Sequence, residues 1–166
     1  KVLDWKDILS EKGAWDAMFW MGGLVALATA LAKSGFIAWI AKLIGTAVAA
    51  ANMGWIASFV LISLIYIYSH YCFASVTARI SAMYAAFVAV AAACGVPAML
   101  VAITFGCFAN LPISLTHYGN GCGPVYFGAG YVSQGEWWRN GFIITTINVV
   151  IWLTIGMAWW KFIGLY

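Results

Sequence analysis

The sequence predicts an all-α integral membrane protein, and three observations support this fold class. Hydrophobic residues make up 65% of the 166 residues and charged residues only 8%, against about 25% charged residues in ordinary globular domains. Between Lys42 and Glu136 the one formal charge is Arg79. The net charge of +3 is scattered and forms no basic run. This excludes a nucleic-acid partner and leaves the lipid bilayer as the expected surroundings.

Residues 1–68 are expected to form two transmembrane helices with an interfacial helix between them. A span needs about 20 apolar residues, and residues 15–32 and 55–68 supply most of two such spans. Residues 36–50 carry Lys42 in a shorter apolar run, which is typical of a helix that lies along the membrane surface. The chain opens on alternating charges without an initiator Met, so we expect it to be part of a longer protein.

Residues 69–95 combine polar and small side chains around Arg79. A guanidinium at a helix centre costs about 2.5–3.5 kcal/mol in hydrocarbon, so Arg79 must face protein, water or an anion. A helix would place Ser75 and Arg79 on one face. We expect a re-entrant hairpin with Ser75-Val76-Thr77 at its tip, because irregular backbone at depth must be buried or line a cavity. The spacing leaves open an ordinary spanning helix whose hydroxyls bond their own backbone.

Residues 96–132 are expected to form a broken transmembrane helix. Pro112 removes a backbone donor and kinks a helix, and glycines at 119, 121 and 123 cannot sustain a helix in lipid. An apolar segment interrupted in this way points to a binding site at membrane depth. Residues 133–166 are then expected to form the last transmembrane helix, because Ser133 and Glu136 have capping-box spacing before an apolar run.

Candidates for metal or enzyme chemistry are weak. Three interpretations of His117 stay open, namely a satisfied core or loop histidine, a contact to a substrate or proton, and a metal ligand. The cysteines show no metal-ligand spacing, so no metal site and no cofactor are predicted. They are Cys72, Cys94, Cys107 and Cys122. An intramembrane enzyme that uses His70, His117 and a cysteine is a further alternative, but it lacks a neighbouring carboxylate in the sequence.

Three passages of the sequence resemble the divalent anion:sodium symporter family. They are residues 73–78, 110–112 and 126–138. Residues 70–86 and 114–118 look most like the bacterial and plastid branch, which exchanges 2-oxoglutarate, malate, citrate, tartrate or succinate. The resemblance covers nearly the whole chain. It implies a secondary active transporter of di- or tricarboxylates, and not an enzyme, in the bacterial inner (cell) membrane or the plastid inner envelope.

The resemblance also implies an architecture and a site. Family members have two inverted repeats, each with a hairpin and a broken helix, and they form homodimers with an elevator-like mechanism. This chain would be the C-terminal repeat, without the N-terminal half of the same transporter. Ser75, Val76 and Thr77 would bind one substrate carboxylate. On the broken-helix side the resemblance implies the side chains of Ser114, Thr116 and Asn120 and the backbone of Asn110, Pro112, Gly119 and Gly121.

Two departures from the family pattern bear on the coupling ion. The family's tip is Ser-Asn-Thr, and Val76 stands in place of the Asn. The loop after Pro112 is also longer and richer in glycine than in the sodium-coupled members. Arg79 and His117 offer positive charge in place of sodium. A fixed cation in an empty site opposes its return across the membrane, so these departures predict an exchanger.

Two other functions stay open at this stage. One is a sodium-coupled dicarboxylate symporter of the same family, with sodium as the coupling ion near Ser75, Thr77 and Thr116. The other is a structural membrane subunit, in which the hydroxyl groups at the tip serve stability alone.

Overall fold

The regular structure of the chain is entirely helical in the part that the structure describes. This computed structural model describes the backbone of residues 4–166, and no strand occurs within that range. The predicted all-α class is therefore confirmed. Side chains at ten helical positions lie outside the description, at residues 17, 20, 21, 24, 25, 28, 31, 32, 37 and 49.

The chain begins with a short helix followed by two longer ones. Helix α1 (Trp5–Ser10) is exposed and starts at a capping box formed by Asp4 and Asp7. Helix α2 (Lys12–Lys33) covers the first predicted span, and its 22 residues correspond to about 33 Å of helix. That length is enough to cross a bilayer.

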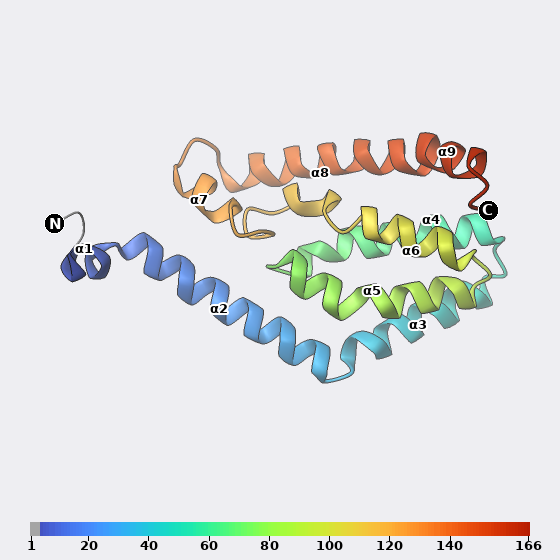
Figure 1. Cartoon of the computed structure of the whole chain (residues 1–166), viewed down its shortest axis with the longest axis horizontal. Helices are drawn as coiled ribbons and strands as arrows, with labels where there is room; N and C mark the ends of the chain where they lie inside the picture. Colours follow the sequence, from blue (N-terminus) through green and yellow to red (C-terminus); the bar gives the residue numbers. More distant parts are fainter. Residues whose placement is uncertain (1–3) are drawn as a thin grey trace.

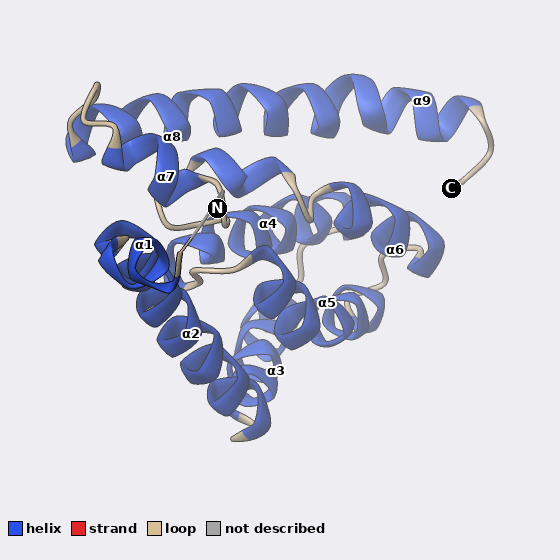
Figure 2. Cartoon of the chain, turned by 60° about the vertical axis from the view of Figure 1, so that its left-hand side comes forward, coloured by secondary structure: helices blue, strands red, loops and turns tan. Residues whose placement is uncertain are grey.

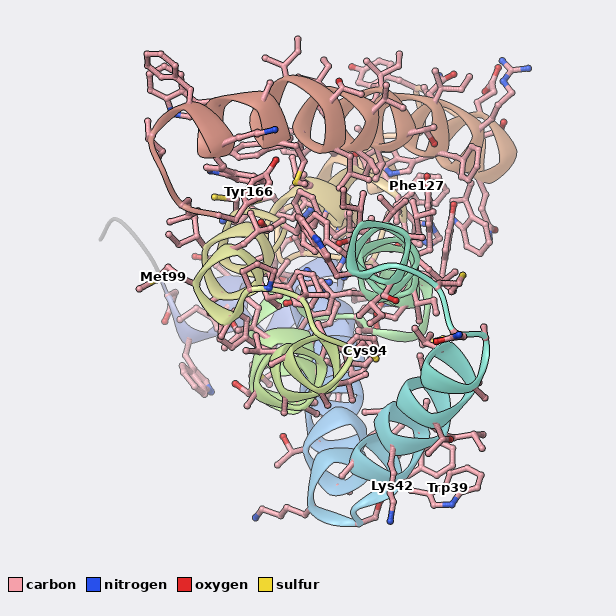
Figure 3. All side chains as sticks on the ribbon, turned by 90° about the vertical axis from the view of Figure 1, so that its right-hand side faces the viewer. Trp39, Lys42, Cys94, Met99, Phe127 and Tyr166 are labelled. Carbon is pink, nitrogen blue, oxygen red and sulfur yellow. The ribbon has the colours of Figure 1, made fainter. Side chains whose placement is uncertain are left out.

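Helix α3 (Phe36–Ala50) follows α2 after a tight turn, and the two helices meet at an angle (Figure 1). The turn contains Gly35 at φ +76°, a conformation that glycine adopts without strain. Figure 3 shows Trp39 and Lys42 pointing away from the other helices, and the Trp39 side chain is 59% exposed. The helix predicted for residues 36–50 is present, while its position along the membrane surface stays a prediction.

Helices α4 (Trp55–Tyr68) and α5 (Val76–Ala93) form an antiparallel helical hairpin (Figure 1). A 3-10 turn at Ser69–Cys72 prolongs α4, and the chain reverses at residues 73–75. The arms of this hairpin are therefore α4 and α5, and it is longer than the hairpin expected at residues 69–95. The sequence did not indicate that α4 is an arm of the hairpin, because the continuous apolar run of residues 55–68 has the pattern of a separate membrane span. Re-entry of the hairpin into the membrane stays a prediction.

The segment expected to be a broken helix is interrupted in the structure. Helix α6 (Ala98–Cys107) ends before a 3-10 turn at Leu111–Ser114. An irregular loop then leads to the short helix α7 (Gly123–Gly128). Pro112 and the following glycines account for the interruption.

The last helical segment runs along one side of the molecule (Figures 1 and 2). Helix α8 (Gln134–Ile151) begins with the predicted capping box of Ser133 and Glu136. A π-helical turn at Trp152–Gly156 joins it to α9 (Met157–Phe162) without a break in direction.

The core lies where α4, α5 and α6 meet. The rings of Tyr66 and Phe105 stack at a centroid distance of 4.6 Å, and Phe87 packs against Tyr66 at 5.7 Å. All three side chains are buried. Trp152 approaches Phe108 edge-on at 6.3 Å, which brings the π-helical turn over the end of α6.

Three helical segments are long and apolar enough to cross a membrane among the described residues. They are Trp55–Cys72, Val76–Ala93 and Gln134–Phe162. Shorter apolar helices occur at Ala38–Val48 and Ala98–Ser114. These lengths agree with an integral membrane protein and place the hairpin turn and the broken segment between apolar helices.

Candidate functional site

The predicted tip residues lie at the start of α5. Ser75 is the N-cap residue, and its Oγ accepts a hydrogen bond from the backbone N–H of Ala78 at 3.3 Å. Val76 and Thr77 form the first turn, with Ser75 and Val76 half-buried and Thr77 exposed. The first N–H groups of a helix lack intrahelical acceptors and favour negative charge. The tip therefore offers donors that suit a carboxylate.

The broken segment is held against α8 by close backbone packing. A Cβ at Gly141 would overlap the Ser114 carbonyl oxygen and would lie 3.1 Å from the Cα of Leu115. One turn further along α8, the hydroxyls of Ser114 and Thr145 lie 3.2 Å apart in a hydrogen bond. Because glycine alone permits this approach, α8 fixes the position of the 3-10 turn at Leu111–Ser114.

Asn120 caps α7 from within the loop. Its Oδ1 accepts hydrogen bonds from the backbone N–H groups of Cys122 and Gly123, both at 2.8 Å. Its Nδ2 donates to the Ile113 carbonyl at 3.4 Å. Asn120 therefore joins the two ends of the loop, and its predicted contact with substrate stays a prediction.

Thr116 and His70 meet beneath Gly119, where the hairpin touches the broken segment. Both side chains are fully buried, the Thr116 hydroxyl lacks a hydrogen-bond partner among the described residues, and the His70 ring faces the backbone of Gly119. A Cβ at Gly119 would lie 2.9 Å from the Thr116 hydroxyl oxygen and closer still to His70 Nε2. The Gly119 backbone therefore packs directly on both side chains, and this contact joins the hairpin to the broken segment.

Arg79 of α5 connects its own helix to α4 and to the end of α6. Its side chain is fully buried, and Nη1 donates to the Tyr66 carbonyl at 2.9 Å. Nη2 donates to the carbonyls of Phe108 at 3.1 Å and Ala109 at 2.7 Å. These carbonyls lie at the C-terminal ends of α4 and α6, which favour a cation. Arg79 faces protein, and no carboxylate pairs with it among the described residues.

His117 belongs to an aromatic cluster that joins the loop to α7 and α8. Its ring stacks on Phe127 at 4.4 Å, and its Nδ1 accepts a hydrogen bond from Trp138 Nε1 at 3.3 Å. The neighbouring Tyr118 hydroxyl donates to the Tyr71 carbonyl at 2.9 Å. Figure 3 shows Phe127 close to α8.

Comparison with known proteins gives this arrangement a family. The sequence model described as the sodium:sulfate symporter transmembrane region matches residues 1–166. The chain belongs to this family. The predicted resemblance to the divalent anion:sodium symporters is thereby confirmed. The family consists of transporters, so the intramembrane enzyme is excluded and the chain is an integral membrane polypeptide.

Individual relatives are similar over almost the whole chain. A chloroplastic dicarboxylate transporter 1 of Spinacia oleracea is 45% identical over 165 residues, which is 99% of this chain and 29% of that protein. The Arabidopsis thaliana protein of the same name is 43% identical, over 99% of this chain and 30% of that protein. A Bacillus subtilis protein named as a candidate malate transporter is 46% identical, over 100% of this chain and 34% of that protein. This chain therefore spans about a third of the length of these relatives.

The structure brings some of the predicted site residues together and adds others. Thr116, Gly119 and His70 adjoin one another, while the backbone at Pro112 lies in the 3-10 turn held by α8. Asn110 and Gly121 are exposed, and no described side-chain hydrogen bond involves either of them. Sequence reasoning missed Gly141 and Trp138 as supports of the loop, because each acts on residues more than 20 positions away. The one sequence feature that could have indicated a support for the loop was the Trp137-Trp138 pair next to the predicted helix start.

Proposed function

We propose that the protein containing this chain is a secondary active transporter of dicarboxylates or tricarboxylates and that it works as an exchanger. The substrate class is that of 2-oxoglutarate, malate, citrate, succinate and tartrate. The names of the plant relatives as dicarboxylate transporters support this class. The position of Ser75 and Thr77 at the start of α5, with donors suited to carboxylates, supports the same class.

The observation that carries the exchange proposal is the environment of Arg79. Its charge is buried and is solvated by three backbone carbonyls, without a carboxylate among the described residues. Carbonyl oxygens are also the ligands that hard cations select, and here the guanidinium occupies them. The side chain of Val76 adds no oxygen at the tip. In this proposal the buried guanidinium supplies the positive charge that a coupling sodium ion would otherwise bring.

The fixed charge links substrate binding to movement. An empty carrier would have to move an uncompensated positive charge through the membrane, which is costly. A bound dianion offsets that charge, so the loaded carrier moves more easily. In this proposal the empty carrier stays in place until a second dicarboxylate binds, which is the requirement for exchange.

The remaining residues have proposed roles in binding. Ser75 and Thr77 donate hydroxyl hydrogen bonds to one carboxylate, and Thr116 binds the substrate from the broken-helix side. Ser114 and Asn120 support that side, and His117 contributes a polar contact. The positive charge predicted for His117 is not part of this proposal, because an Nδ1 that accepts a hydrogen bond from Trp138 Nε1 is unprotonated and belongs to a neutral imidazole.

The larger assembly is also part of the proposal. The remainder of the polypeptide would supply a second hairpin tip for the other substrate carboxylate. The whole protein would form a homodimer and move its site by an elevator-like motion, in a bacterial cell membrane or a plastid inner envelope. The close contact between α8 and the 3-10 turn suits such a motion, since these parts can move as one body.

Transport assays on the full-length protein in proteoliposomes test exchange. Vesicles loaded with malate should take up labelled malate, while empty vesicles should not, and a sodium gradient should have no effect. Strong uptake into empty vesicles, driven by inward sodium, would refute exchange. It would favour the sodium-coupled symporter, which the family's description keeps as the second candidate.

Substitution at the tip tests the site itself. The double variant Ser75→Ala, Thr77→Ala should reduce malate uptake at least tenfold, because two hydrogen bonds to an anion are lost. Thr154→Val is a matched control, since the Thr154 hydroxyl bonds only the backbone of its own helix. Normal uptake by a well-expressed double variant would support a structural membrane subunit instead.

A further inference from the structure

The hydrogen bond between Trp138 and His117 defines the protonation state of the histidine. The indole Nε1 of Trp138 lies 3.3 Å from His117 Nδ1. An indole nitrogen can donate a hydrogen bond but cannot accept one. Nδ1 must therefore be unprotonated, and a neutral imidazole then carries its proton on Nε2. This single contact selects one of the three states that a histidine can adopt.

The surroundings of the ring hold it in this orientation. Phe127 stacks on the imidazole at 4.4 Å with an interplanar angle of 28°, and Tyr118 meets it edge-on at 5.1 Å. The Tyr118 hydroxyl is already bonded to the Tyr71 carbonyl, so it does not compete for the imidazole. The ring is half-buried, and no described residue accepts a hydrogen bond from Nε2.

The loop that carries this ring also carries Thr116, which the proposed function assigns to the broken-helix side of the site. His117 directly follows the buried Thr116 in sequence, and the backbone of Gly123 packs against the His117 carbonyl so closely that a Cβ at Gly123 would overlap it. Both ends of the loop are also joined through Asn120. The imidazole is therefore held at Nδ1, which accepts the hydrogen bond from Trp138, while no described residue uses the Nε2–H donor.

We propose that Trp138 is a positioning residue that holds His117 as the neutral Nε2–H imidazole, and that this N–H donates a hydrogen bond to a carboxylate of the transported anion. The second half of this inference rests on the proposed function, whereas the first half does not. A neutral donor recognises the anion without adding a second fixed charge to that of Arg79. Release of the anion on the far side of the membrane is then less costly than from two cations.

Nitrogen NMR of the full-length transporter in lipid nanodiscs tests the tautomer directly. The protein is labelled with ¹⁵N-histidine, and the His117 signals are identified as those lost in His117→Gln. In the wild type these signals should show a protonated Nε2 and an unprotonated Nδ1. Trp138→Phe keeps an aromatic ring but removes the donor, so the two neutral tautomers should mix. Trp159→Phe is the control, because Trp159 lies in α9, is 58% exposed and has its ring contact with Phe162, and it should leave the spectrum unchanged.

Two measurements decide the proposal. A wild-type Nδ1 that carries the proton, or an identical spectrum in Trp138→Phe, would overturn the positioning role. Addition of malate should shift the Nε2 signal, and Trp138→Phe should raise the KM for malate about tenfold with little change in maximal rate. A defined tautomer without any response to malate would overturn the contact with substrate. If the protein transports no carboxylate at all, the spectrum still reports the positioning role on its own.

Discussion

Arg79 and His117 are held in opposite ways, although both are polar groups among apolar helices. Arg79 is fully buried and bonded to three backbone carbonyls on α4 and at the end of α6. His117 is half-buried and depends on one side-chain hydrogen bond and aromatic packing. The first arrangement fixes a charge and joins helices, while the second leaves one ring nitrogen without a hydrogen-bond partner among the described residues. In the proposed transporter the hairpin would thus supply a permanent positive potential and the broken segment would supply a neutral hydrogen-bond donor.

Removal of the guanidinium is the change with the largest expected effect. Arg79→Gln should lower the free energy of unfolding by about 4.5 kcal/mol, at about 1.5 kcal/mol for each of the three hydrogen bonds lost from a charged donor, and should strongly reduce exchange. Thermal unfolding of the full-length protein and malate exchange per folded molecule are the measurements. Arg79→Lys keeps the charge but loses the planar fork of donors, so it should recover part of the exchange with less recovery of stability. Full stability in Arg79→Gln would disprove the joining role.

A methyl group between α8 and the broken segment should have the next largest effect. Gly141→Ala would place a Cβ into the Ser114 carbonyl, and overpacking of this kind costs about 1–3 kcal/mol. Malate uptake should fall because the 3-10 turn is displaced. Gly135→Ala lies on the same helix, where a Cβ meets nothing within 4 Å, and it should behave as the wild type. Equal uptake by both variants would show that α8 does not position the loop.

Loss of the hydrogen bond between Thr145 and Ser114, one turn after Gly141 in α8, should have the smallest effect. Thr145→Val removes the hydrogen bond to Ser114 while keeping the buried volume, so the expected loss is about 1 kcal/mol. Chemical or thermal unfolding measures this loss, and Thr154→Val provides the reference for a hydroxyl that bonds its own helix. A loss as large as that of Arg79→Gln would mean that the broken segment is held as firmly as the hairpin, and the contrast between them would disappear.

The sequence by itself determined the features that depend on local composition and spacing. Low charge and high hydrophobicity required an all-α membrane protein, and Ser133 with Glu136 predicted the start of α8. Pro112 and the glycines predicted the interruption before α7. The cost of a guanidinium in lipid required that Arg79 face protein, water or an anion. Each of these conclusions follows from one residue type in one environment or from residues within one helical turn.

Only the tertiary structure decided which groups meet. The partners of Arg79 are backbone carbonyls up to 30 positions away. Because every residue has a carbonyl, no pattern of side chains in the sequence identifies these partners. The need for glycine at position 141 comes from the backbone of another segment, which the local sequence does not show. The pairing of Trp138 with His117 depends on the path of a loop across 21 positions. Such contacts are set by how helices pack, and packing is a property of the whole fold.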